Sequence, residues 1–223
     1  MNQITLSENV MVSDPCYSPD TWCQTKLDNV LPGLYNVEVD RHDEGTGWGI
    51  RVSGITILHE SITDDGISLE WEDHSECGVD SGQCGIFCMT GYRNDEVSEG
   101  ITPPTLYNPF VIPFREDGDK WYEKICHFTL VEPQWGSYDT GVVSSSGLGD
   151  GMYPVEVMYD KEKIVGIRIT YLGNSDKDLL DEGDCCGVCG GELEEDGECV
   201  YCCDEEEYII PDTEDENIEP IKN

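Results

Sequence analysis

Four cysteines near the end of this 223-residue sequence form its strongest chemical pattern. They occur as two Cys-x-x-Cys pairs separated by nine residues, which is the spacing of a zinc ribbon. Each pair would hold one side of a tetrahedral ion, so we expect one structural Zn²⁺ bound by Cys186, Cys189, Cys199 and Cys202. Four thiolates leave no open position for catalysis. Cys185 and Cys203 lie just outside the pairs and are expected to substitute as ligands or form a disulfide.

Aspartates next to glycines form a second set of candidates, this time for catalysis. Asp80-Ser81-Gly82 and Asp139-Thr140-Gly141 each have the Asp-Ser/Thr-Gly form with which aspartic peptidases bring two carboxylates together to share a proton. A different hydrolase would use Asp80 with Asp150, or add Asp14 and a divalent cation, since Mg²⁺ and Ca²⁺ prefer carboxylate oxygens. The simpler alternative is that Asp80 and Asp150 cap turns.

The remaining cysteines are spaced irregularly. One group is a candidate for a second metal site, although its members are also typical of buried, reduced thiols: His74, Cys77, Cys84 and Cys88. Cys16 and Cys23 are expected to be buried thiols that pack beside Trp22.

The elements that would position these residues are mostly strands. Residues Gly147–Leu172 predict a β-hairpin, because apolar residues alternate on both sides of a charged turn at Asp160–Lys163. Short alternating runs separated by turn residues continue through the chain, which is typical of an antiparallel β-sandwich or open barrel. The predicted fold is therefore mainly β, with a small C-terminal zinc ribbon in addition.

Local patterns give the individual elements. We expect a bulge near Gly54. We also expect a long, ordered, proline-rich loop over Val97–Pro113 that covers one sheet edge. One or two helical turns are expected at Thr21–Lys26, after the start signal Ser18-Pro19-Asp20. The predicted strands are Leu34–Val39, Trp48–Leu58, Ile67–Trp71, Gly85–Thr90, Trp121–Val131 and Thr140–Ser145.

Composition divides the chain into four parts. Residues 1–172 form the expected β-rich domain, 173–184 an acidic linker, 185–203 the zinc ribbon and 204–223 an acidic tail that is largely disordered. From Gly173 onward there are nineteen acidic residues and two lysines, too few apolar side chains for a core without metal.

The charge restricts the partners. The whole chain has 48 acidic and 12 basic residues and a formal net charge of −36. Nucleic acid and anionic membranes both require a basic surface, so neither is an expected direct partner. The charge is compatible with a basic partner, and the expected partner is a protein whose identity the sequence does not give. An acidic surface of this kind also permits a DNA mimic that inhibits a nucleic-acid-binding protein. No apolar run reaches the ~20 residues of a membrane span, and the N-terminal residues lack an export signal, so a cytoplasmic location is expected.

Three segments together resemble an uncharacterised domain-of-unknown-function family of bacteria and their phages. They are the boxes Ser13–Tyr17, Val79–Phe87 and Gly147–Val155. The resemblance covers about residues 4–172 and implies one β-rich domain in the bacterial cytoplasm, or in the host cytoplasm if the protein is phage-encoded, without implying a reaction. The cysteine-rich end and the acidic tail depart from the family pattern.

The function expected from these observations is binding. We expect an acidic, zinc-binding phage or bacterial accessory protein that acts by binding another protein and inhibits or redirects a host factor. The alternatives are the carboxylate-dependent hydrolase, using Asp80 with Asp150 or Asp139, and the DNA mimic. The glycine residues beside them predict that Asp80 and Asp150 lie at turns on the same end of the β domain, near Pro103–Pro113.

Overall fold

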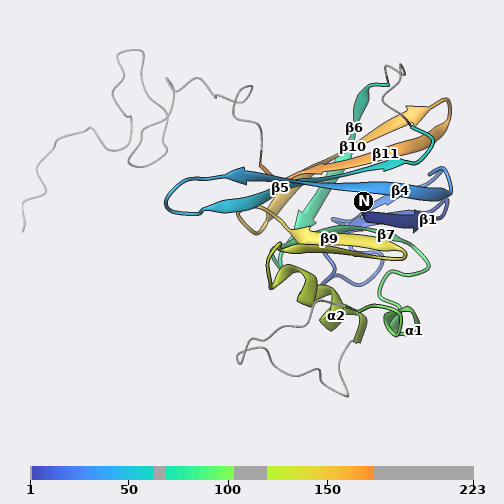
Figure 1. The fold of residues 1–223 in the computed structure, drawn as a ribbon. Helices are drawn as coiled ribbons and strands as arrows, with labels where there is room; N and C mark the ends of the chain where they lie inside the picture. The colour runs from blue at the N-terminus through green and yellow to red at the C-terminus, as the bar shows by residue number, and fades with distance from the viewer. Residues whose placement is uncertain (1, 63–68, 103–119, 173–223) are drawn as a thin grey trace, which may run out of the picture. The chain divides into compact units, whose positions relative to one another are not determined.

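The computed structural model describes residues 2–62, 69–102 and 120–172. All of them belong to the first of the two units into which the chain divides, Met1–Gly173. This unit is mainly β, with two antiparallel sheets that do not close into a barrel (Figure 1). Within the described ranges, no helix is long and apolar enough to cross a membrane.

The first sheet has six strands and contains the predicted hairpin. β10 and β11 pair antiparallel, and Asp160 lies opposite Lys163 at the turn, which confirms that prediction. Ser53 is the extra residue where β5 pairs with β4, so the bulge beside Gly54 is also confirmed. The order is β1 (Asn2–Leu6), β4 (Gly33–Asp43), β5 (Ile50–His59), β11 (Lys163–Thr170), β10 (Gly151–Asp160) and β6 (Trp71–Val79).

β6 differs from its prediction. The sequence predicts a strand over Ile67–Trp71. Ile67 and Ser68 lie outside the described residues, and β6 begins at Trp71 and continues to Val79. Its middle, from Glu72 to Glu76, is polar and exposed. Charged residues are tolerated there because, among the described strands, β6 is at the edge of its sheet and has β10 as its one neighbour.

The second sheet has five shorter strands, all antiparallel. The predicted strands over Gly85–Thr90 and Thr140–Ser145 correspond to β7 and β9, which pair with each other in its middle. β8 was absent from the prediction. The order is β3 (Thr25–Leu27), β2 (Val10–Ser13), β7 (Gln83–Cys88), β9 (Gly141–Ser145) and β8 (Trp135–Tyr138).

Both sheets contribute side chains to one hydrophobic core. Ile55 and Ile167 come from the six-stranded sheet, and Val12, Ile86 and Val142 from the five-stranded sheet. All five are completely buried. Burying a side chain of this size contributes about 1.5–3 kcal/mol, so alternation along the strands places one face of each sheet against this core.

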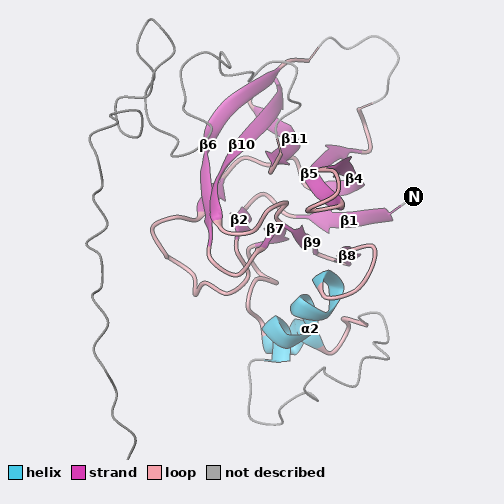
Figure 2. Ribbon diagram, turned by 90° about the vertical axis from the view of Figure 1, so that its left-hand side faces the viewer, coloured by secondary structure: helices cyan, strands magenta, loops and turns pink. Residues whose placement is uncertain are grey.

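A second, smaller core lies on the other face of the five-stranded sheet. Phe87 and Val143 point away from the main core and pack with Trp121, Ile125 and Phe128 of α2 (Lys120–Thr129). The short α1 (Asp95–Ser98) lies beside α2, and Figures 1 and 2 show the helical layer on this side of the sheet.

Two local predictions are wrong. The predicted strand over Trp121–Val131 is instead α2 for most of its length, because its buried residues Trp121, Ile125 and Phe128 recur with helical spacing. No helix forms at Thr21–Lys26. Asp20 has a positive φ of 71°, which is outside the right-handed helical region, so no helix starts at this residue. Thr25 already begins strand β3.

Candidate functional site

The three sequence boxes meet at one end of the β domain. β2 ends at Ser13, immediately before Asp14, while Asp80 follows β6 and Asp150 precedes β10. In the register of β6 and β10, Val79 lies opposite Gly151. This pairing brings the Asp80 and Asp150 turns together, as predicted. The predicted neighbour, Pro103–Pro113, lies outside the described residues.

Asp14 joins the first box to the second. Its side chain is completely buried. One carboxylate oxygen accepts hydrogen bonds from the backbone N–H of Cys16 at 2.7 Å and from the Ser81 hydroxyl at 2.7 Å. The other accepts from the backbone N–H groups of Asp80 and Ser81, at 2.9 and 2.7 Å. Four donors thus satisfy a buried carboxylate and fix the turn that carries Asp80.

Asp150 joins the third box to the second. Its carboxylate accepts a hydrogen bond from the backbone N–H of Gly82 at 3.1 Å. Gly82 has a φ of 67°, a conformation that residues with a Cβ rarely adopt. The turn alternative for Asp150 therefore has direct support.

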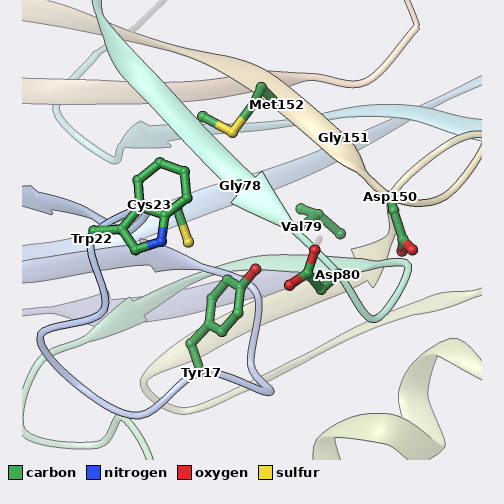
Figure 3. A pocket seen from close by; sticks show the side chains of 9 residues that line it. All are labelled: Tyr17, Trp22, Cys23, Gly78, Val79, Asp80, Asp150, Gly151 and Met152. Carbon is green, nitrogen blue, oxygen red and sulfur yellow. The ribbon is translucent and has the colours of Figure 1, made fainter.

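An open pocket of about 430 Å³ lies over this junction (Figure 3). Gly78 has no side chain, which allows Cys23 and Met152 to pack closely against its backbone in the lining. A Cβ at this position would come within 2.8 Å of the Cys23 Cβ and 3.1 Å of the Met152 Sδ. The lining residues are Tyr17, Trp22, Cys23, Gly78, Val79, Asp80, Asp150, Gly151 and Met152. The lining therefore combines two carboxylates with aromatic and sulfur-containing side chains, and none of its described residues is basic.

Trp22 is the most unusual member of the lining. Its side chain is 86% exposed, more than that of any other large hydrophobic residue described. The expectation that it packs beside two buried thiols is wrong, since only Cys23 is buried and Cys16 is half-buried. Met152 is also exposed, at 47%. Exposed large apolar side chains that gather around one pocket are typical of a contact surface.

The Tyr17 phenol at the pocket and the nearby Cys16 thiol are held in their neutral forms. Burial and hydrogen bonds to Asp80 and Cys23 raise the pKa of the Tyr17 hydroxyl, and Figure 3 shows this hydroxyl directed toward Asp80. Burial and the Asp14 carboxylate raise the pKa of Cys16 to about 12. Cys16 is thus a neutral thiol at physiological pH and a poor nucleophile.

Asp139 lies elsewhere. In the pairing of β7 with β9, Gln83 lies opposite Ser145 and Phe87 lies opposite Gly141. Asp80 precedes Gln83 and Asp139 precedes Gly141, so the two aspartates are at opposite ends of this strand pair. The paired arrangement that an aspartic peptidase requires is not formed, and the hypothesis of an Asp80–Asp139 dyad is wrong.

The second candidate metal site is not assembled. Cys77 and Cys84 approach each other, with 3.7 Å between their sulfur atoms. Cys88 instead contacts Ser7 and Thr90, and His74 is on the exposed part of β6. Among the described residues, no group of three or more His, Cys, Asp or Glu side chains is arranged to hold a metal ion. The predicted zinc ligands Cys186, Cys189, Cys199 and Cys202 lie outside the described residues.

Sequence reasoning missed the aromatic part of the pocket. The sequence indicates Tyr17 only as part of the first box and Trp22 only as a residue that packs beside cysteines. The one available signal was the position of Trp22 in a turn between prolines, aspartates and polar residues, where a tryptophan has few partners.

Comparisons with known proteins add no further identification: no family model, curated protein or solved structure matches this chain. The resemblance to the bacterial and phage family therefore stays a prediction.

Proposed function

We propose that this protein binds a protein partner by accepting a basic side chain, arginine or lysine, in the pocket formed by Trp22, Asp80 and Asp150. The observation that carries the proposal is a tryptophan that is 86% exposed and lines the same open pocket as two carboxylates. In the bacterial or phage setting that the family resemblance implies, such binding would inhibit or redirect a host factor.

The chemistry of the lining supports a cationic ligand. An indole face attracts a guanidinium or ammonium group by about 0.5–2 kcal/mol, and a carboxylate adds a charge-assisted hydrogen bond. Among the described lining residues, none is basic and competes for Asp80 or Asp150. The net charge of −36 would also accelerate encounter with a basic partner. Arginine fits best, because its planar group stacks on aromatic rings and binds carboxylates through two donors.

Hydrogen bonds fix the turns that carry the two pocket carboxylates, and this preorganisation favours ligand binding. Asp14 holds the Asp80 turn through its hydrogen bonds to the Asp80 and Ser81 amides, and Asp150 is tied to Gly82. The carboxylates are therefore positioned before a ligand arrives, which reduces the entropy lost on binding.

A peptide titration tests the ligand class. An arginine-containing peptide should bind the full chain, and the same peptide with neutral citrulline should bind at least about tenfold more weakly. Trp22→Ala should weaken binding of the arginine peptide roughly 30-fold, corresponding to ~2 kcal/mol for loss of an aromatic anchor. Calorimetry measures both effects. Equal affinity for the two peptides would contradict the proposal.

Trp48 provides the matched control. It is also an exposed tryptophan, at 55%, but it contacts Arg51 outside the pocket. Trp48→Ala should leave peptide affinity unchanged. The same pair of variants serves as bait in a pull-down from bacterial lysate, where a true partner is retained by the wild type and Trp48→Ala and lost with Trp22→Ala.

The shared pocket of Asp80 and Asp150 favours a second candidate, the carboxylate-dependent hydrolase. Its test is turnover of fluorogenic peptide, ester and glycoside substrates. A hydrolase would lose activity in both Asp80→Asn and Asp150→Asn and keep it in Asp139→Asn, whose carboxylate is at the other end of the sheet. Activity that is equal in all three variants, or absent from the wild type, would remove this candidate.

For the C-terminal cysteines, we propose one structural Zn²⁺ held by Cys186, Cys189, Cys199 and Cys202. Their spacing alone supports this proposal. Elemental analysis should find one zinc per chain, lost in Cys189→Ser and in Cys202→Ser. The neighbouring variants Cys185→Ser and Cys203→Ser should keep it. A full complement of zinc in Cys189→Ser would contradict this ligand set.

A further inference from the structure

Cys77 and Cys84 form an isolated pair of thiols inside the main core. Cys77 is on β6 of the six-stranded sheet, and Cys84 is on β7 of the five-stranded sheet. Their sulfur atoms are 3.7 Å apart, and both side chains are completely buried. The pair therefore connects the two sheets across the core.

We propose that Cys77 and Cys84 are a disulfide-forming pair whose oxidation covalently joins the two sheets. Sulfur atoms at 3.7 Å are in van der Waals contact, and a disulfide requires them to approach to about 2.05 Å. Pairing with other strands fixes both backbones, because Cys77 lies opposite Tyr153 and Cys84 lies opposite Ser144. The arrangement is independent of the basic ligand proposed above.

The disulfide would close a ring around the turn that carries the pocket aspartate. Gly78–Gln83 connects the two cysteines and includes Asp80, Ser81 and Gly82. In the reduced protein, hydrogen bonds to Asp14 and Asp150 hold this turn. Oxidation would add a covalent constraint at its base, where β6 leaves one sheet and β7 enters the other.

Cys88 is the other buried cysteine of β7 that could take part in a disulfide in place of Cys77 or Cys84. Burial raises the pKa of Cys88, but hydrogen bonds from the Ser7 and Thr90 hydroxyls outweigh that effect and lower the pKa overall. Cys88 thus has more thiolate character than an ordinary cysteine. Its sulfur, however, lies 2.9 Å from the Ser7 hydroxyl, four residues along β7 from Cys84 and so roughly 13 Å away along the strand. Reactivity favours Cys88, whereas geometry favours Cys77 with Cys84.

The oxidant is a small disulfide such as oxidised glutathione. One cysteine thiolate attacks a glutathione sulfur, forms a mixed disulfide and releases one reduced glutathione. The thiolate of the other cysteine then attacks the protein sulfur of that mixed disulfide and releases the second glutathione. The two protein thiols lose two electrons and two protons, and the glutathione disulfide gains them.

The test is to refold the full chain in a mixed glutathione buffer and to map its disulfides. Remaining thiols are blocked with N-ethylmaleimide, and the chain is then cut before aspartates. We expect Asp73–Val79 linked to Asp80–Asn94 through Cys77 and Cys84, with Cys88 carrying maleimide. Reduction should separate the two peptides. Maleimide on both Cys77 and Cys84, or a linkage through Cys88, would overturn the proposal.

Two variants check the assignment. Cys88→Ser should keep the linked peptides unchanged, and Cys77→Ser should lose them. Because Cys77 is buried, its variant is compared with the wild type by near-ultraviolet circular dichroism. The wild-type map alone decides the proposal if that variant does not fold. The oxidised wild type should also unfold at a higher urea concentration than the reduced form, and Cys77→Ser should show no such difference.

Discussion

The triplets Asp80-Ser81-Gly82 and Asp139-Thr140-Gly141 are nearly the same in sequence, but the fold gives them different surroundings. Around Asp80, two amides and the Ser81 hydroxyl donate to the buried Asp14, and the Gly82 amide donates to Asp150. Asp139 is exposed at the β8–β9 turn, and its carbonyl accepts a hydrogen bond from the Thr5 amide.

The glycines differ for the same reason. Gly82 has a positive φ of 67°, and no atom lies closer than 4.0 Å to the position of a Cβ. Gly141 faces the opposite constraint, since a Cβ there would lie 2.8 Å from the Phe87 ring and 2.8 Å from the Tyr138 hydroxyl. One glycine is required by backbone conformation and the other by space. A short motif therefore acquires its role from the residues that surround it in the fold.

The strongest test of this contrast removes the support of the first triplet. Asp14→Ala should lower the free energy of unfolding by about 3–5 kcal/mol, because three backbone amides and a hydroxyl lose a buried charged acceptor. Asp139→Ala should change it by less than about 0.5 kcal/mol, as for other exposed positions. Urea unfolding measures both values. Similar losses in the two variants would break the comparison.

The next effect is expected at the second triplet. Gly141→Ala should cost about 1–3 kcal/mol, because its methyl group collides with the aromatic rings of Phe87 and Tyr138. Phe87→Leu in the same chain should recover part of this loss by making room. If Gly141→Ala unfolds at the same urea concentration as the wild type, the spatial explanation for this glycine is wrong.

The hydroxyl of the first triplet provides a smaller test. Ser81→Ala should lower stability by about 1–2 kcal/mol, since it removes a 2.7 Å hydrogen bond to the Asp14 carboxylate. Ser18→Ala, at an exposed position between β2 and β3, is the control and should have little effect on stability. A Ser81→Ala variant as stable as Ser18→Ala would show that the backbone donors alone hold the turn.

The smallest effect concerns backbone conformation. Gly82→Ala should cost about 1 kcal/mol because alanine is disfavoured at positive φ, and Gly82→Asn should cost less because asparagine adopts this conformation more readily. The order would reverse at Gly141, where the larger asparagine is harder to accommodate than alanine. Thermal unfolding of the four variants tests this reversal, and the same order at both glycines would contradict it.

The predictability of the fold varied with the kind of pattern. β10 and β11 were predictable because their apolar residues alternate without interruption, and only one face of a strand can be buried. α2 was not, because Trp121, Ile125 and Phe128 are the only buried apolar anchors in a short segment and their helical spacing is easily read as a strand. β6 was missed in its acidic middle because an edge strand tolerates charges that strand propensity disfavours.

The candidate site was predictable in one respect. The glycine-flanked boxes indicated that Asp80 and Asp150 occur at turns, and their meeting at one pocket agrees with that prediction. The contribution of Trp22 was not predictable, because exposure depends on which segments pack over a residue. The Asp80–Asp139 hypothesis failed because antiparallel pairing of β7 with β9 sends the two turns to opposite ends.

The mainly β character, the central hairpin and the acidic charge can be predicted from the residues alone, because each follows from neighbours in the chain or from composition. Two long-range contacts depend on the fold: Asp14 supports the Asp80 turn across 66 residues, and Cys77 meets Cys84 between two sheets. Those contacts depend on strand register and on which faces pack together. Both are set by the whole core, so no local pattern specifies them.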